Sequence, residues 1–170
     1  MRIGHGFGPV YDGNSGVLIL GSFPSVGSRK IAFYYGHPQN RFWRVLSRVF
    51  SDPVPDGTEE RKAYLARHKI ALWDAVESCE ITGSADAAIR DPIPTDLGTV
   101  FAVSPIRAIF CNGTLAYSLL LKNPTLPAGI PVFRLPSTSP ANAAWSEERL
   151  VEEWRIVEKY VCGGVAQYAL

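Results

Sequence analysis

The chain has 170 residues, of which 46% are hydrophobic and 19% are charged, and its formal net charge is +1. This length suffices for one domain with its own hydrophobic core. No apolar run approaches the roughly 18 residues that a membrane span requires, and the first residues lack the apolar stretch of a signal peptide. We therefore expect a soluble, cytoplasmic monomer that does not associate with membranes.

The three cysteines, Cys79, Cys111 and Cys162, are scattered along the chain. Their spacing matches neither a disulfide framework nor a CxxC metal site. An iron–sulfur cluster usually takes four cysteine ligands, which this chain does not have. The sequence therefore predicts no metal and no cofactor, and it fits a reducing compartment.

Acidic residues are unevenly distributed along the chain. None lies between Asp12 and Asp52 or between Asp96 and Glu147, and the first of these segments carries Lys30 and several arginines. If the two acid-free segments meet in space, they form a surface suited to a polyanion. The alternative is a chance distribution of charge on a solvated surface.

The first half of the chain alternates between strand and helix patterns. Residues 17–20 form an apolar run after the turn signals of DGNSG, which predicts a buried strand that leads into a loop. Helical spacing of apolar residues then predicts an amphipathic helix ending near residue 50, with Pro38 in its first turn. A polar helix over 58–69, a strand over 70–76 and a turn-rich loop over 78–96 are predicted next.

The second half continues the alternation. A helix over 97–103, capped by Thr95 or Asp96, precedes a strand over 106–111, a helix over 114–121, a strand over 132–135 and a helix over 143–160. Such strands, apolar along their length, are typical of a parallel sheet buried on both faces. The prediction is an α/β fold, a three-layer sandwich with a central four-stranded parallel sheet flanked by helices. Residues 1–162 would form one domain and 163–170 a loosely ordered tail.

In open parallel sheets, ligands bind beyond the carboxyl ends of the strands. In this chain those ends are followed by residues 21–23, 74, 112–113 and 136–137. Three motifs lie in or near these loops: GSFPS at 21–25, HPQNRFW at 37–43 and LPSTSPAN at 135–142. We therefore expect the functional site in these loops.

In order and spacing, the three motifs resemble those of the uracil-DNA glycosylase superfamily. HPQNRFW is similar to the corresponding segment of the mismatch-specific uracil and thymine glycosylases. Together with LWDAVESCE, GSAD and FCNG, the motifs resemble the hypoxanthine-DNA glycosylase branch over nearly the whole chain. The resemblance implies a DNA glycosylase that removes a deaminated base, hypoxanthine before xanthine or uracil, from double-stranded or single-stranded DNA.

Two positions depart from the superfamily pattern. In GSFPS, Phe23 stands where members often carry a catalytic Asn or Asp, and in LPSTSPAN, Leu135 stands where many carry His or Asn. Neither side chain donates or accepts a hydrogen bond. The resemblance implies that Asn40, in the neighbouring loop, takes over the polar role.

Base excision requires a flipped nucleotide, a pocket and a held water. Phe23, with Tyr34 or Tyr35, is expected to stack on the base beside Ser22. The amide of Asn40 or Asn112 has the donor and acceptor needed to read the edge of hypoxanthine. We expect the carbonyl of Asn40 to hold the water, with His37 as a second catalytic donor.

The expected DNA contacts are polar or basic residues of the same loops and of the helix after HPQNRFW. The hydroxyls and prolines of the 136–142 loop suit phosphate contacts and a stiff minor-groove probe. The predicted set is Ser25, Arg41, Arg44, Pro136, Ser137, Thr138, Ser139 and Asn142.

Each assignment has a structural alternative. Asn40 could be a helix cap, Phe23 ordinary core, His37 a loop residue and Asn112 part of a turn with Gly113. The loop serines could be turn formers, the arginines a solvated helix face, and Asp74 a local cap or ion-pair partner.

The function also has alternatives. One is a uracil or thymine mismatch glycosylase, and another is a non-catalytic nucleic-acid-binding protein of the same fold. A serine hydrolase using Ser22 or Ser137 is disfavoured because the chain has no GxSxG motif. None of the five lysines lies in the motifs, so a Schiff-base nucleophile is not indicated and a monofunctional enzyme is expected.

Overall fold

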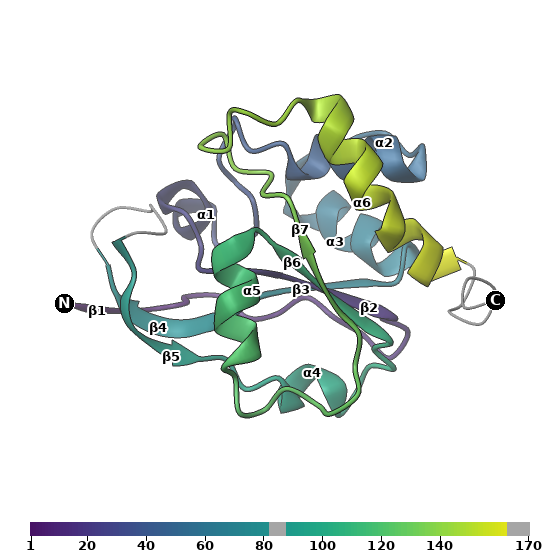
Figure 1. Cartoon of the computed structure of the whole chain (residues 1–170). Coiled ribbons are helices and arrows are strands. Elements are labelled where there is room, and N and C mark those ends of the chain that lie inside the picture. The colour runs from purple at the N-terminus through teal and green to yellow at the C-terminus, as the bar shows by residue number, and fades with distance from the viewer. Residues whose placement is uncertain (82–87, 163–170) are drawn as a thin grey trace.

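A computed structural model describes residues 1–81 and 88–162 of the chain. Its centre is a sheet of β2 (Val17–Gly21), β3 (Ile70–Asp74), β6 (Ala108–Asn112) and β7 (Val132–Leu135). The strand order is β3-β2-β6-β7 and every pair is parallel (Figure 1). The predicted four-stranded parallel sheet is confirmed.

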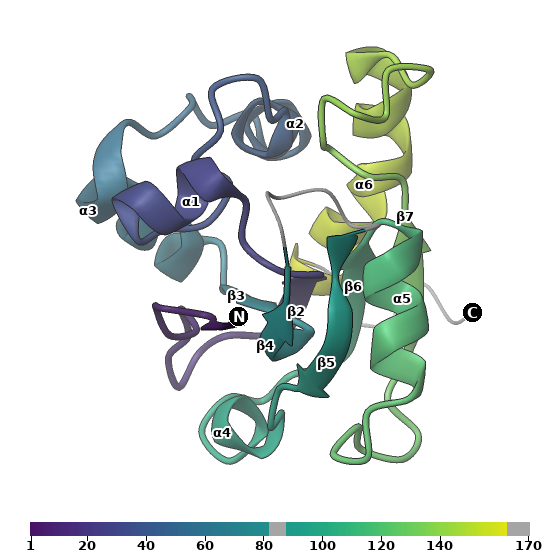
Figure 2. The same ribbon diagram turned by 90° about the vertical axis from the view of Figure 1, so that its left-hand side faces the viewer.

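Helices cover both faces of this sheet because its side chains alternate between two apolar layers. Val17 and Ile19 pack with α2 (Phe42–Phe50), α3 (Gly57–Arg67) and α6 (Glu147–Cys162). Leu18 and Leu20 point the other way, toward α4 (Gly98–Phe101) and α5 (Thr114–Leu121). Figure 2 shows the two helical layers on opposite sides of the sheet. The three-layer α/β sandwich is therefore confirmed.

The segment between β2 and α2 differs from the prediction. Instead of a continuous loop it contains a short helix, α1 (Val26–Ile31), whose N-cap Ser25 accepts a hydrogen bond from the backbone N–H of Ser28. Pro38 does not lie in the first turn of α2, because residues 37–40 form a turn in which Asn40 N–H donates to the His37 carbonyl at 3.0 Å. The helix begins only after this turn, at Phe42.

A second, antiparallel sheet was not predicted. It consists of β1 (Arg2–Gly4), β4 (Val76–Glu80) and β5 (Arg90–Pro94) in the order β1-β4-β5. The prediction of a loop over 78–96 was wrong for the parts that form β4 and β5. β5 is short, exposed and contains two prolines. In the sequence these features indicate a turn, but a strand at the edge of a sheet tolerates them.

The pairing of β1 with β4 brings the start of the chain next to the end of β3. The backbone N–H of His5 donates to the Glu77 carbonyl at 2.8 Å, directly after the register pair Gly4 and Ser78. β4 follows β3 after a single residue, Ala75. His5 is thus held beside Asp74, although 69 positions separate the two residues.

Some predictions concern residues that the structure does not describe. The GSAD segment at 83–86 and the expected loose tail at 163–170 lie outside the described residues. Within residues 1–81 and 88–162, no helix combines the length and apolar character needed to span a bilayer.

Trp154 provides a test of the packing between α6 and the sheet. It is fully buried, packs edge-to-face on Phe42, and its indole N–H donates to the Pro136 carbonyl at 3.0 Å. We expect Trp154→Ala to lower the free energy of unfolding by about 3–5 kcal/mol in urea titrations. Leu121→Ala, at a side chain that is 54% exposed, should change it by less than about 0.5 kcal/mol. Equal effects of the two substitutions would contradict this account of the core.

Candidate active site

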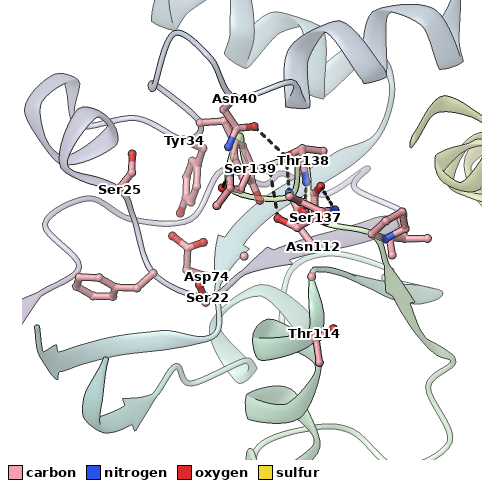
Figure 3. A pocket seen from close by; sticks show the side chains of 18 of the residues that line it. Ser22, Ser25, Tyr34, Asn40, Asp74, Asn112, Thr114, Ser137, Thr138 and Ser139 are labelled. Atoms are coloured by element: carbon pink, nitrogen blue, oxygen red, sulfur yellow. Dashed lines mark hydrogen bonds between the residues drawn. The ribbon is translucent and has the colours of Figure 1, made fainter. Parts of the chain in front are cut away.

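A cavity of about 750 Å³ opens at the carboxyl end of the parallel sheet. All four strands of that sheet contribute their last residues to its lining, namely Gly21, Asp74, Asn112 and Leu135. Figure 3 shows Asp74 and Asn112 in the wall of this cavity. Its volume lies within the range of roughly 300–1,000 Å³ that is usual for ligand pockets. The position beyond the strand ends is the one that the sequence predicted.

Most of the predicted site residues meet in this cavity. Those that line it are Ser22, Phe23, Ser25, Tyr35, Asn40, Asn112, Pro136, Ser137, Thr138, Ser139 and Asn142. His37, Arg41 and Arg44 are not part of the lining. The three motifs therefore form one site. Arg41 and Arg44, at the start of α2, do not line it.

The two acid-free segments of the chain meet at this cavity. Its lining comes from residues 21–40 and 112–145, with the addition of Asp74 and Glu153. These two carboxylates are the only acidic residues of the lining among the described residues. A wall with so few carboxylates is suited to the approach of a polyanion.

Thr138 connects three parts of the site from the interior. Its backbone N–H donates to Asn112 Oδ1 at 3.0 Å, and its hydroxyl accepts from Asn112 Nδ2 at 3.0 Å. The same hydroxyl donates to Asn40 Oδ1 at 2.8 Å. Because the side chain is 0% exposed, the prediction that Thr138 contacts DNA is wrong. Its hydroxyl instead fixes the two asparagine side chains.

The orientation of the Asn40 amide follows from its partners. Oδ1 accepts hydrogen bonds from the Phe42 backbone N–H at 3.0 Å and from the Thr138 hydroxyl. The Phe42 N–H can only donate, so the atom facing it must be the amide oxygen. Since a carbonyl oxygen has two lone pairs, both acceptor positions are occupied. The oxygen therefore has no acceptor position left for the water that it was expected to hold. The N–H₂ group of Asn40 is directed away from Thr138 (Figure 3).

The arginines of the HPQNRFW motif and of α2 contact protein groups. The guanidinium of Arg41 donates to the carbonyls of Trp145, Ser139 and Asn142, and so ties the 136–145 loop to the start of α2. Arg44 forms an ion pair with Glu147 at 2.9 Å and holds the pKa of that carboxyl below its usual range. Arg41 thus has a loop-holding role that the sequence did not indicate.

His37 is placed in the turn before α2. Its Nδ1 accepts a hydrogen bond from the backbone N–H of Gln39 at 3.1 Å, and its carbonyl accepts from Asn40 N–H. These contacts match the structural alternative of a loop histidine. The structure does not bring its ring to the cavity lining.

The 136–142 loop uses its polar side chains to shape its own turns. Ser137 Oγ accepts from Ser139 N–H at 3.1 Å, and Ser139 Oγ accepts from Ala141 N–H at 3.2 Å. The amide of Asn142 donates to the Ser137 carbonyl at 3.0 Å. The three side chains are partly exposed on the cavity wall, so a phosphate contact through them stays a prediction.

The aromatic residues form a wall with a constrained backbone. Phe23 is 9% exposed and packs with Val76 and Cys79 while still lining the cavity. Tyr35 has φ = 54°, in the left-handed region that non-glycine residues rarely adopt, and its ring stacks on Phe42 at 3.9 Å. Such strain is kept where the surrounding packing determines it, which is common at functional sites.

The sequence assigned no function to a buried acidic group in the cavity. Asp74 ends β3 and its Oδ2 lies 2.7 Å from His5 Nε2. Nearby, burial and, to a smaller degree, the charge of Asp74 raise the pKa of Tyr34 far above its usual value. Asp74 follows an apolar run in the sequence, and this position could have marked it as a residue of the site. His5 has no such signal, because only the pairing of β1 with β4 brings it there.

Within the described parts of the chain, no group of three or more His, Cys, Asp and Glu side chains is arranged to hold a metal ion. The cavity is instead walled by amides, hydroxyls and aromatic rings, together with the Asp74 carboxylate. These groups suit hydrogen bonding and stacking with a planar heterocycle. Fold and site together define a parallel α/β protein with a polar and aromatic cavity at the carboxyl edge of its sheet.

Comparison with known proteins identifies the family. The sequence model described as "Uracil DNA glycosylase superfamily" matches residues 8–160, and the chain belongs to that superfamily. It is 35% identical over 162 residues to a protein of Methanosarcina acetivorans named hypoxanthine DNA glycosylase, covering 93% of this chain and 99% of that protein. A protein of the same name from Methanosarcina barkeri is 34% identical over 110 residues, covering 64% of this chain and 70% of that protein.

A solved structure shows the same fold. The solution NMR structure of a candidate uracil DNA glycosylase from Methanosarcina acetivorans superposes with a TM-score of 0.75 at 33% sequence identity. The match covers 93% of this chain and 99% of the other. The resemblance predicted from the three motifs is confirmed.

The central position of Thr138 predicts a large effect of removing its hydroxyl. Thr138→Val keeps the shape of the side chain but removes one hydrogen bond from each of the partly buried amides of Asn40 and Asn112. We expect the free energy of unfolding to fall by about 1–3 kcal/mol in urea titrations. Thr99→Val, at an exposed position of α4, should be nearly neutral. A neutral Thr138→Val would show that the network does not hold the site together.

Proposed function

We propose that this protein is a monofunctional DNA glycosylase that hydrolyses the N-glycosidic bond of a flipped deaminated base, foremost hypoxanthine, and leaves an abasic site for base excision repair. The observation that carries the proposal is the cavity in which all three superfamily motifs meet around the fixed amide of Asn40. The similarity to proteins named hypoxanthine DNA glycosylase supports the choice of base.

The cavity suits a base that has left the duplex. Unstacking costs a few kcal/mol, which the enzyme must recover by contacts with the flipped base. Stacking on an aromatic ring contributes about 1–3 kcal/mol, and Phe23 presents such a ring in the wall, with Ser22 beside it and Tyr35 also in the lining. The second N–H of Asn112 Nδ2, beyond the one that reaches Thr138, is a donor for the carbonyl of the base.

Asn40 is the catalytic residue in this proposal, and it acts through its N–H₂ group. Cleavage of a deoxyribosyl bond builds positive charge on the sugar and negative charge on the base, so fixed dipoles and a positioned water provide most of the assistance. The Asn40 N–H groups hold the attacking water by its oxygen. The bonds from Phe42 and Thr138 fix the amide in advance, so that no reorganisation is needed during the reaction.

DNA is held around the cavity mouth by polar groups of the motif loops. Ser25, Ser137, Ser139 and Asn142 lie in the lining and have hydroxyl or amide groups for phosphates, and Pro136 stiffens the loop. Arg41 contributes by holding this loop, while His37 and Arg44 lie outside the cavity. We expect one chain, with residues 1–162 as a single domain, to act alone in the cytoplasm on single-stranded or double-stranded DNA.

The absence of a lysine nucleophile makes the reaction a simple hydrolysis. A bifunctional glycosylase attacks the sugar with an amine and forms a Schiff base. None of the five lysines lines the cavity, although all of them lie within the described residues. Base release should therefore leave an intact abasic strand.

A substrate panel tests the proposed function. We expect the protein to release base fastest from duplexes with inosine, more slowly from those with xanthine or uracil, and to form no borohydride-trapped adduct. Faster release of uracil or mismatched thymine would favour the mismatch glycosylase. Binding without release from any of these duplexes would show a non-catalytic binding protein.

Two substitutions separate the catalytic role of Asn40 from its capping role. Asn40→Ala should lower the single-turnover rate about 100-fold or more, with DNA binding largely intact. Asn40→Asp keeps an oxygen for Phe42 N–H and Thr138 but replaces the N–H₂ group, so it should retain stability and still lose base release. Gln39→Ala, at an exposed neighbour, serves as the control. An active Asn40→Asp would show that the N–H groups are not required.

A further inference from the structure

The segment 136–146 between β7 and α6 supplies much of the cavity lining but has no charged residue. Figure 1 shows it leaving the sheet at the end of β7 and entering α6. Its hydroxyl and amide groups are able to contact phosphates, but they provide no net charge to attract a polyanion. Charged residues on either side of the segment have to provide that attraction.

Three arginines of the HPQNRFW motif and of α2 have their charge engaged by other protein groups. Arg41 donates to three backbone carbonyls within the segment 136–146. Arg44 and Arg48 both form ion pairs with Glu147, at 2.9 and 3.2 Å. Arg48 also lies 3.4 Å from Glu148. Since these pairs compensate the two glutamates at the start of α6, α2 adds little uncompensated charge beside the segment.

Two other arginines flank the segment, and each lies over an aromatic ring instead of beside a carboxylate. The guanidinium carbon of Arg134, in β7, is 5.9 Å from the centre of the Tyr117 ring. That of Arg149, in the first turn of α6, is 4.1 Å from the centre of the Trp145 ring. Both arginines are exposed. Within residues 1–81 and 88–162, neither guanidinium takes part in an ion pair or a hydrogen bond.

The ring contacts hold the two cations at the cavity and leave their donors available. A guanidinium is able to lie over a ring through its face, while its N–H groups, in its own plane, match two phosphate oxygens. Arg134 lines the cavity and is the only basic residue among the described residues of the lining. Arg149 lies over Trp145, also in the lining, although Glu153 is at a spacing that would allow an ion pair.

We propose that Arg134 and Arg149 form a phosphate clamp on the two sides of the segment 136–146, in which each guanidinium binds a backbone phosphate of the DNA next to the flipped nucleotide. Tyr117 and Trp145 are positioning residues, because their rings hold the two cations in place. The inference rests on the proposed function, since it assumes that DNA lies across the mouth of the cavity.

The test measures the dissociation constant for undamaged duplex DNA at several salt concentrations, so that neither base recognition nor base release contributes. Each phosphate contact adds about 0.9 to the slope of log Kd against log salt concentration. Arg134→Gln and Arg149→Gln should each lower this slope by about one and weaken binding about 5- to 10-fold at about 0.1 M salt. The double substitution should lower the slope by about two. Wild-type slopes in both folded single variants would overturn the proposal.

Two arginines outside the clamp serve as matched controls. Arg155 is exposed on the same helix as Arg149 and does not line the cavity, and Arg155→Gln changes the net charge by the same amount. Arg48→Gln removes a charge that is paired with glutamates. Both variants should keep the wild-type slope. If Arg155→Gln lowered the slope as much as Arg149→Gln does, the effect would come from net charge and the clamp would be wrong. A slope lowered by Arg48→Gln and not by Arg149→Gln would place the contact on α2 instead.

Two further measurements distinguish a phosphate contact from a structural role of Arg149. Arg149→Lys keeps the charge and should retain the wild-type salt slope, because the release of counterions depends on charge. The single-turnover rate at saturating inosine duplex should stay within about threefold of wild type in Arg149→Gln, because the guanidinium does not touch the reacting base. A fall in this rate without a change in Kd would contradict the clamp.

The positioning role of the rings is tested by a double-mutant cycle. Tyr117→Leu removes the ring beneath Arg134 but leaves the charge, so Arg134→Gln should weaken binding less in this background than in the wild-type protein, by about twofold or more. Tyr117→Phe keeps the ring and should behave as wild type. An equal effect of Arg134→Gln in the Tyr117→Leu and wild-type backgrounds would remove the positioning role of Tyr117.

The outcomes also separate this inference from the proposed function, because phosphate binding does not require base release. If the wild-type protein shows the expected slopes and releases no base from inosine duplexes, the proposed function fails and the clamp stands. If it releases hypoxanthine while both Gln variants keep the wild-type slope, only the clamp fails.

Discussion

The parallel direction of the four central strands is the constraint on which the site depends. Because β2, β3, β6 and β7 run the same way, the loops that follow them leave the sheet at one edge. Motifs separated by more than a hundred residues thereby meet around one cavity. The apolar layers on both faces keep this edge rigid, so short loops can hold polar groups in defined positions.

The polar groups of the site are arranged by buried hydrogen bonds more than by the sheet itself. Thr138 uses its N–H and its hydroxyl to fix Asn112 and Asn40, and Arg41 fixes the carbonyls of the same loop. Thr138 and Arg41, which the sequence predicted as DNA contacts, thus support the residues that face the cavity. This division is physically reasonable, because a catalytic amide is useful only when its own partners hold it still.

The distribution of acidic residues around the cavity is uneven. The lining comes from two segments without acidic residues, which favours the approach of DNA, yet a carboxylate lies at its floor. Asp74 Oδ2 lies 2.7 Å from His5 Nε2, so this buried carboxylate has a polar partner within the protein. The small antiparallel sheet is what makes the pairing possible.

The sequence by itself determined the sheet, its layers and the three motifs, because uniformly apolar strands and helical periodicity depend on local composition. It also indicated the place of the cavity and most of its lining, including Phe23, Asn40 and Asn112. Only the tertiary structure decided that Thr138 is buried, that Asn40 turns its N–H₂ group away from Thr138, and that His5 meets Asp74. These features depend on hydrogen bonds between distant segments, and no local pattern of residues encodes the direction of a donor or the proximity of a partner 69 positions away.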